Sequence, residues 1–237
     1  MTGPAGTEFS ADETQKSRYD ESYFAVYRGD QVRALMYERE RAAIELLLPS
    51  GGRILDVGCG LGLFLEGFSK ERWDRYGVEL ADLAIQEARQ KGIQVNDFVS
   101  AYVYPAQYFN VIVFRGTLQL LQTPFQVVKE CIGLLAPGGF MVFLATPNSN
   151  SPYYRRFGTL PFLTPHGNFL IPSDRMMRSA LQNFGLEVLT IRYPYLETPY
   201  ARPFRDHLLY ALSLFGVRRK FAFWRSMMEI YSRKPLT

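Results

Sequence analysis

The stretch Ile54-Leu55-Asp56-Val57-Gly58-Cys59-Gly60-Leu61-Gly62 decides the fold. It begins as an apolar run, reaches an acid, and continues into glycines at every second position. Glycine adopts backbone torsions that other residues avoid, and its missing Cβ leaves room for a ligand at the carboxyl end of a strand, where open α/β sheets bind ligands. The stretch therefore predicts a strand, a tight turn around a ligand, and the start of a helix.

Acids at the ends of the first two expected strands indicate a ligand without phosphate groups. Asp56 ends the first strand, and Glu79 ends the second, where a carboxylate can accept both hydroxyls of a ribose. A nicotinamide-dependent oxidoreductase is the enzyme alternative. Its turn follows G-x-G-x-x-G, however, and Leu63 stands where the last glycine would be. The chain also has no Tyr-x-x-x-Lys pair. A glycine turn alone is often only a tight connection, so the two acids carry this prediction.

Strand-like and helix-like stretches alternate along the chain, as in parallel βαβ units. Strands are expected over residues 53–57, 75–79, 93–95, 111–114, 140–145, 186–193 and 228–233. Helices are expected over residues 30–48, 63–70, 82–91, 124–135 and 173–184. The pattern predicts an α/β, doubly wound sheet that is mostly parallel, with helices on both faces.

A chain of 237 residues with 47% hydrophobic and 21% charged residues is typical of one globular domain. We expect a flexible N-terminus over residues 1–18 and a single domain over 19–237. Two loop-rich insertions, at about 147–172 and 195–226, exceed ordinary connections and are predicted to form a cover on the substrate side.

Composition disfavours several other classes of protein. Cys59 and Cys131 are the only cysteines, and with two histidines in the chain they suggest neither a zinc site nor a disulfide scaffold. No apolar core of a signal peptide and no run of about 18 apolar residues is present, so a cytoplasmic location is expected. The net charge of +4 depends largely on one late basic stretch, so we expect no nucleic-acid partner.

The glycine stretch and Glu79 resemble the first two motifs of class I S-adenosylmethionine (SAM) dependent methyltransferases. Residues 108–116 resemble the fourth-strand motif of that family, and residues 134–140 resemble its turn before the fifth strand. The chain looks most like the bacterial small-molecule branch, which is methyltransferase type 11/12/23-like and similar to ubiquinone-biosynthesis O-methyltransferases. The resemblance implies a Rossmann-like sheet of seven strands with an antiparallel strand at its end. It also implies SAM as cofactor, S-adenosylhomocysteine as product, and no metal.

Carried over to this sequence, the resemblance implies a set of cofactor-binding residues. These are Asp56, Gly58, Cys59, Gly60, Gly62, Glu79, Leu80, Phe98, Val99, Arg115, Gly116 and Tyr23. Tyr23, with Tyr19 and Tyr27, resembles an N-terminal lid over the cofactor, although aromatic residues this close together also commonly pack a helix onto a sheet. Arg115 is expected either to orient the methionine carboxylate or to pair with an acid.

The reaction expected from the resemblance is methyl transfer to a small-molecule acceptor, more often at oxygen than at nitrogen or carbon. A hydroxyl of a natural product, quinone, lipid or sugar would need a base, and His166 is the candidate, with a purely structural loop role as the alternative. The family usually has Asp where Asn110 stands and commonly His where Leu120 stands. A SAM-binding partner or regulatory subunit without catalysis therefore remains an alternative.

The segment 207–224 mixes leucines and aromatics with Arg218, Arg219 and Lys220. A basic amphipathic element suits an anionic membrane surface or a lipid-linked substrate. A cover over the substrate cleft or a dimer contact would produce the same pattern. Both a monomer and a homodimer are compatible with the sequence.

Overall fold

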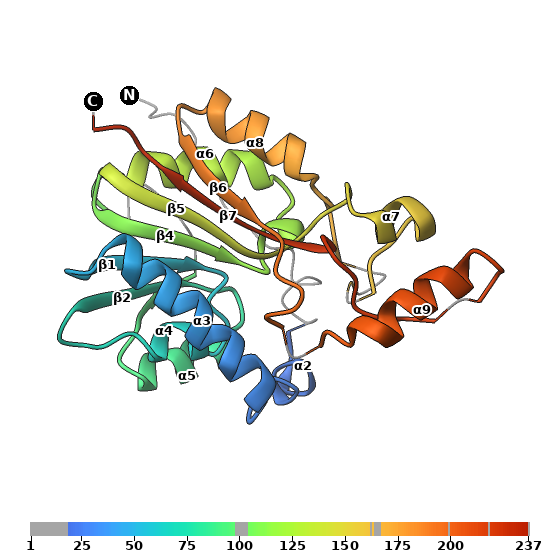
Figure 1. Ribbon diagram of the computed structural model, residues 1–237. Coiled ribbons are helices and arrows are strands. Elements are labelled where there is room, and N and C mark those ends of the chain that lie inside the picture. The colour runs from blue at the N-terminus through green and yellow to red at the C-terminus, as the bar shows by residue number, and fades with distance from the viewer. Residues whose placement is uncertain are drawn as a thin grey trace. The chain divides into compact units, whose positions relative to one another are not determined.

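Seven strands form the sheet of the computed structural model, which describes residues 19–97, 104–161, 163, 167–198, 200–217 and 219–236. They are β1 Gly52–Val57, β2 Trp73–Val78, β3 Gln94–Asn96, β4 Phe109–Arg115, β5 Leu135–Pro147, β6 Glu187–Arg192 and β7 Met227–Arg233. Their order is β3-β2-β1-β4-β5-β7-β6 (Figure 1). β1 pairs in parallel with β2 and β4, β2 pairs in parallel with β3, and β6 and β7 are antiparallel. The predicted seven-stranded, mostly parallel sheet is confirmed.

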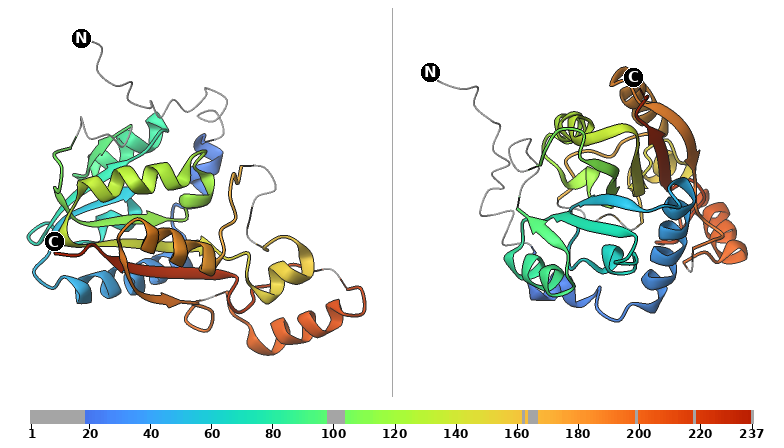
Figure 2. Two further views of the ribbon diagram at one scale, coloured as in Figure 1. Left: turned by 90° about the horizontal axis from the view of Figure 1, so that it is seen from above. Right: turned by 90° about the vertical axis from the view of Figure 1, so that its left-hand side faces the viewer.

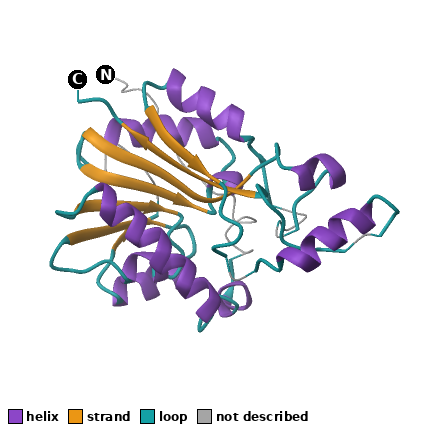
Figure 3. Cartoon of the chain, viewed as in Figure 1, coloured by secondary structure: helices purple, strands orange, loops and turns teal. Residues whose placement is uncertain are grey.

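Helices form in each of the five stretches where the sequence pattern predicts them, together with further short ones (Figure 3). They are α2 Glu21–Ala25, α3 Gln31–Leu47, α4 Leu63–Glu66, α5 Asp82–Gln90, α6 Pro124–Leu134, α7 Pro152–Phe157, α8 Asp174–Asn183 and α9 Pro203–Ser213. Asp30 caps α3 and Ser173 caps α8, each through a side-chain oxygen that accepts a backbone N–H from the first turn. In the described part of the chain, no helix is both long enough and apolar enough to cross a bilayer.

The chain divides into two compact units. The first comprises Met1–Val113, Gln126–Met141 and Leu236–Thr237, and the second comprises Phe114–Phe125 and Val142–Pro235. In the first unit, β1 is flanked by β2 and β4, and the last four residues of β1 are buried, as expected for a strand covered on both faces. The second unit contains β6, β7 and α7 to α9.

The two largest differences from the predicted boundaries concern α4 and β5. The helix expected over residues 63–70 ends at Glu66. The next residue, Gly67, lies against the Arg41 guanidinium, and a Cβ on Gly67 would stand 2.2 Å from Cζ of Arg41. The strand expected from residue 140 begins at Leu135, and Gly138 follows with a φ of 74°. A Cβ at Gly139 would lie 3.0 Å from the Asn110 carbonyl oxygen, so glycine lets these two strand backbones approach.

Candidate cofactor site

The glycine turn lies at the carboxyl end of β1, in the first unit. Gly58, Gly60 and Gly62 have φ values of 81°, 52° and 75°, all in the region that favours glycine. The backbone N–H groups of Gly58 and Cys59 both donate to the carbonyl of Val78, at 2.7 and 3.0 Å, so the turn is held against the end of β2. Gly62 is the N-cap of α4. The predicted strand, turn and helix start are confirmed.

The glycines of the turn differ in what surrounds them. A Cβ at Gly62 would stand 2.5 Å from Cδ1 of Ile93 and 3.0 Å from Cβ of Ala88, so this glycine is required by packing. A Cβ at Gly60 would meet only Cε1 of Phe24, at 3.8 Å. The chain therefore leaves open space beside Gly60, as a cradle for a ligand requires.

Glu79 reaches across the turn from the end of β2. Its Oε2 accepts the N–H of Gly60 at 2.9 Å, and its Oε1 accepts the N–H groups of Leu80 and Ala81 at 2.7 and 3.1 Å. A carboxylate has about four lone-pair sites, of which these bonds use three. Glu79 thus joins the glycine turn to the start of α5, and Leu80 takes part through its backbone.

Two negative charges lie close to the turn. Asp56 is buried at 2% exposure in β1. The pKa of the Cys59 thiol is raised well above its usual value, first by burial and then by the charges of Asp56 and Glu79. Cys59 is therefore a packing residue and no nucleophile at neutral pH. Two acids beside an open cradle fit SAM, whose ammonium and sulfonium groups are cationic.

A short helix that the sequence pattern did not predict covers the turn. α2 begins after Asp20, whose side chain accepts the N–H of Tyr23 at 2.9 Å. Phe24 packs in one cluster with Leu61 of the turn and Ala81 and Ala84 of the α5 end, and the partly buried members of that cluster are Tyr19, Tyr23, Tyr27, Leu63 and Leu83. The pKa of Tyr23 is raised by burial, by its tyrosine neighbours and by the charge of Glu79. The tyrosines therefore pack against the cluster that includes Leu61 of the glycine turn.

Asn110, which departs from the usual family residue, does not lie at this end of the sheet. It is the second residue of β4, and its Oδ1 accepts the backbone N–H of Arg53 at 2.9 Å. Oδ1 also lies 2.6 Å from where a Cβ of Gly52 would stand, at the start of β1. An aspartate would offer the same acceptor, so this departure concerns strand packing and does not argue against cofactor binding.

The other predicted site residues fall in the second unit or outside the described residues. Gly116 follows β4 with a φ of 66°, and its N–H donates to the carbonyl of Leu144 at 2.9 Å. A Cβ there would meet nothing within 4 Å. Arg115 is half-buried, and its carbonyl accepts the hydroxyl of Thr117 at 3.2 Å. Phe98, Val99 and His166 lie outside the described residues.

The segment that follows His166 is anchored within the second unit. The backbone N–H of Phe169 donates at 2.8 Å to the carbonyl of Gln119, in the 3-10 turn Leu118–Leu120 just after β4. The Gln119 side chain in turn donates to the carbonyl of Gly116 at 2.7 Å. The ring Nδ1 of the other histidine, His207, lies within hydrogen-bond distance of the Pro203 carbonyl, at 2.7 Å within α9.

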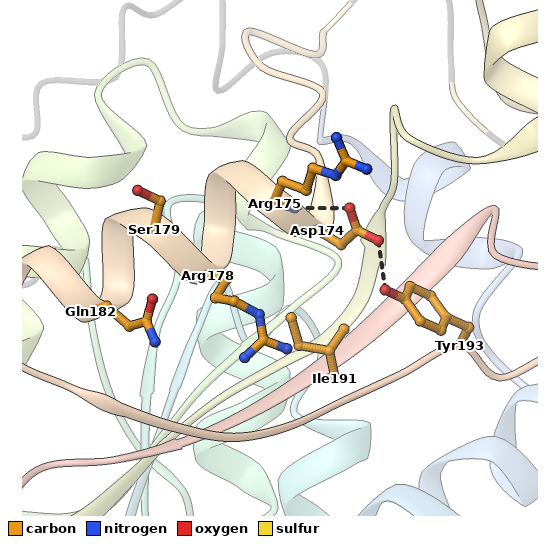
Figure 4. Close-up of a pocket in the computed structure, with 7 residues that line it drawn as sticks. All are labelled: Asp174, Arg175, Arg178, Ser179, Gln182, Ile191 and Tyr193. Atoms are coloured by element: carbon orange, nitrogen blue, oxygen red, sulfur yellow. Dashed lines mark hydrogen bonds between the residues drawn. The ribbon is translucent and has the colours of Figure 1, made fainter.

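A polar cluster around Asp174 in the second unit was missed by the sequence analysis (Figure 4). The carboxylate accepts from Tyr193 at 2.5 Å, from Asn150 at 2.8 Å and from Arg225 at 2.5 Å. Burial opposes ionisation, but these hydrogen bonds outweigh it and lower the pKa of Asp174 to about 2. A shallow cavity of about 240 Å³ lies beside it, lined by Asp174, Arg175, Arg178, Ser179, Gln182, Ile191 and Tyr193. Because the partners come from distant parts of the chain, no local motif marks this cluster.

Comparisons with known proteins agree on one family. The model of a family described as a methyltransferase domain matches residues 27–191. The ubiquinone biosynthesis O-methyltransferase of Azoarcus sp. (strain BH72) is 31% identical over 161 residues, which cover 60% of this chain and 67% of that protein. Relatives of the same name from Bordetella avium and Coxiella burnetii are 31% and 32% identical, and the chain spans 44% and 66% of their lengths. The chain therefore spans about two thirds or less of these curated relatives.

Solved structures of low sequence identity share the fold. A SAM-dependent methyltransferase from Archaeoglobus fulgidus has a TM-score of 0.63 at 19% identity, covering 91% of this chain and 100% of that one. The [4+2]-cyclase SpnF has a TM-score of 0.55, also at 19% identity, covering 81% of this chain and 80% of that one. Because one of these neighbours is named a cyclase, the fold alone does not decide the reaction.

Proposed function

The chain belongs to the methyltransferase domain family, and from that premise we propose that it transfers the methyl group of SAM to a hydroxyl of a small molecule. That it is a SAM-dependent methyltransferase acting on a small molecule follows from the family and the curated relatives. The choice of oxygen is our proposal, and it is supported by the name of those relatives, O-methyltransferase.

One observation carries the cofactor assignment within this proposal: the Glu79 carboxylate spans the open glycine turn and holds its Gly60 N–H at 2.9 Å. We propose that Glu79 accepts the ribose hydroxyls and that Asp56 favours the cationic end of the ligand. The turn glycines would let the backbone approach the nucleoside closely. The remaining members of the proposed binding set are Gly58, Cys59, Leu80, Phe98, Val99, Arg115, Gly116 and Tyr23.

Binding a ribose diol at Glu79 requires a local exchange of hydrogen bonds. Two hydroxyl donors must share a carboxylate whose oxygens already accept three backbone N–H groups. The Gly60 bond is the one that crosses the turn, and we propose that it lengthens or breaks when the ribose binds. Leu80 and Ala81 follow Glu79 directly in the chain, so their bonds to Oε1 can persist.

When bound, SAM supplies an electrophilic methyl group on a sulfonium. The chain must then hold the acceptor in line with it and receive the hydroxyl proton, and positioning supplies much of the rate of such a displacement. We propose His166 as the residue that takes this proton, because it is one of two histidines in the sequence and His207 is engaged within α9. A quinol, a phenolic natural product, a lipid or a sugar would present a suitable hydroxyl.

The first experiment is thermal unfolding with SAM, S-adenosylhomocysteine and NADH. A rise in melting temperature with the first two alone supports the cofactor, because a ligand that binds only the folded state stabilises it. Turnover is then measured with a panel of phenolic, quinol, amine and carbon acceptors. Methylation of amines alone would contradict the choice of oxygen.

The His166 assignment is tested by His166→Ala beside the matched control His207→Ala. We expect the His166 variant to keep its response to S-adenosylhomocysteine and to lose turnover, and the His207 variant to keep both. Equal turnover in the two variants would remove the proposed base.

A second candidate is a SAM-binding protein that catalyses no methyl transfer, favoured by Leu120 at a position where the resembled family commonly has histidine. Leu120 lies in the 3-10 turn after β4, half-buried, and cannot carry a proton. This candidate would be excluded if the parent chain methylates any acceptor of the panel and the His166 variant does not.

A further inference from the structure

Helix α9 presents an unusual arrangement of polar and apolar residues. Asp206 and Ser213 are buried, at 1% and 2% exposure, while Phe204 in the helix and Phe215, just beyond its end, are 87% and 86% exposed. Phe204, Leu208 and Leu212 recur at every fourth position, which places them on one side of the helix. All three are exposed, whereas a surface helix normally turns its apolar side inward.

The inward side of α9 is already satisfied within the second unit. Asp206 accepts from Tyr195 at 3.0 Å and from the backbone N–H of Arg202 at 2.8 Å. Leu209 and Tyr210 pack against an apolar cluster of Tyr153, Leu160, Phe221 and Phe223. Arg156 of α7 donates to the Ser213 carbonyl at 2.6 Å, and Figures 1 and 2 show α7 and α9 side by side. The helix is therefore fixed with Phe204 exposed, outside this packing.

We use the term α9 face for the exposed residues Phe204, Leu208, Leu212, Leu214, Phe215 and Trp224. Exposed cations accompany it: Arg202, Arg205, Arg219 and Lys220. Asp206 is the only acid between residues 200 and 224, and it is buried, so every exposed charge of this stretch that the structure describes is positive.

We propose that the α9 face docks onto an anionic lipid bilayer. Phenylalanine, leucine and tryptophan suit the boundary between headgroups and acyl chains, and arginine and lysine beside them suit anionic headgroups. A second copy of this chain fits less well, because a twofold contact would bring the same cations together without an exposed acid to pair with them. The proposal goes beyond the proposed methyl transfer and does not require the acceptor to be a lipid.

Flotation with vesicles tests the proposal on the full chain, without SAM or acceptor. One vesicle type contains phosphatidylcholine alone, and the other contains equal parts of phosphatidylcholine and phosphatidylglycerol. We expect binding to the mixed vesicles, weakening as salt rises because salt screens exposed charges. The double change Phe204→Ser and Phe215→Ser should lower the partition coefficient at least about ten-fold, since each exposed ring contributes through burial of its apolar surface. Arg205→Gln should lower it about five-fold.

Leu46→Ser is the matched control, because Leu46 is 81% exposed on α3, in the first unit. It should bind vesicles like the parent chain. No binding to mixed vesicles, equal binding to both vesicle types, or equal loss in the control would overturn the proposal. A dimer that the phenylalanine variant converts to a monomer, without vesicle binding by the parent, would overturn it in favour of a second copy. All variants should keep their thermal response to S-adenosylhomocysteine, so failure here is distinguishable from failure of the proposed function.

Discussion

Gly60→Ala and Gly62→Ala should distinguish a glycine that leaves room for a ligand, Gly60, from one that close packing requires, Gly62. Both residues have positive φ, so alanine at either position costs roughly 1–2 kcal/mol of stability from the left-handed backbone alone. At Gly62 the new methyl would also stand 2.5 Å from Ile93 and 3.3 Å from the Ala88 Cα. Overpacking of this kind costs about 1–3 kcal/mol more, giving about 2–5 kcal/mol in total. At Gly60 the nearest atom is 3.8 Å away, and no packing cost is added.

Urea unfolding without ligand measures these costs, with Gly158→Ala as the matched control for φ alone. Gly158 has a φ of 66° and nothing within 4 Å of an added Cβ. Gly60→Ala should therefore match Gly158→Ala, and Gly62→Ala should be clearly less stable than both. Equal stability of the Gly62 and Gly158 variants would refute the packing argument.

S-adenosylhomocysteine then tests the open space beside Gly60. At a ligand concentration about 100 times Kd, the folded state gains about 2.7 kcal/mol, which raises Tm by about 5–10 °C in a chain of this size. The Gly60 variant should lose most of this shift because its methyl occupies the cradle, and the Gly158 variant should keep it. An unchanged shift in the Gly60 variant would mean that the ligand does not lie against this glycine.

Three further predictions concern single side chains. Asp174→Asn should cost about 1–3 kcal/mol in urea unfolding, since the half-buried Arg225 keeps its charge without its partner. Because the pKa of Asp174 is lowered from 3.8 to about 2, its stabilisation is present above about pH 4 and lost as the pH falls toward 2. A parent chain whose stability advantage over the variant does not shrink in that window would contradict this. Ala145→Gly should raise Tm by about 1–4 °C, because Ala145 has a φ of 47° within β5, and a lower Tm would show that the strain is absent. Glu79→Gln should weaken S-adenosylhomocysteine binding about ten-fold or more in calorimetry. Asp82→Asn, which changes an exposed acid at the start of α5, should leave the affinity unchanged. Equal affinities of the two variants would remove Glu79 from the site.

The sequence predicted the sheet and the glycine turn well because both depend on local patterns. Alternating apolar stretches specify strands and helices, and a glycine with positive φ is visible as a residue type. The helices α2 and α7, of five and six residues, were not predicted, because elements this short are stabilised mainly by tertiary contacts. The α9 helix lies within the stretch 195–226, which was predicted as a loop-rich insertion. The α2 helix, for example, depends on Phe24 packing against Leu61, a residue of the distant turn.

Polar contacts between distant segments could not be predicted from the sequence either. Asp174 and Arg225 are 51 residues apart, and nothing in either neighbourhood indicates that the two pair. Asn110, where the resembled family usually has Asp, was one reason to keep a protein without catalysis as an alternative, yet its side chain accepts the backbone N–H of Arg53 at the start of β1. Position along a strand, which the residue type does not reveal, decides whether a polar residue meets the ligand or the neighbouring strand.

The negative charges of Asp56 and Glu79 explain why the proposed site should bind SAM, which is cationic, in preference to a nucleoside that carries a pyrophosphate. Two unit charges about 5 Å apart interact by roughly 3 kcal/mol at the effective dielectric constant typical of protein sites. On the proposed site, Asp56 and Glu79 would each attract the cationic groups of SAM and repel a pyrophosphate by amounts of this order. The difference between the two ligands is then several kcal/mol, or more than about a hundred-fold in affinity. A thermal shift with NADH that equals the shift with SAM would contradict this argument, since neither acid could then face the ligand in its charged form.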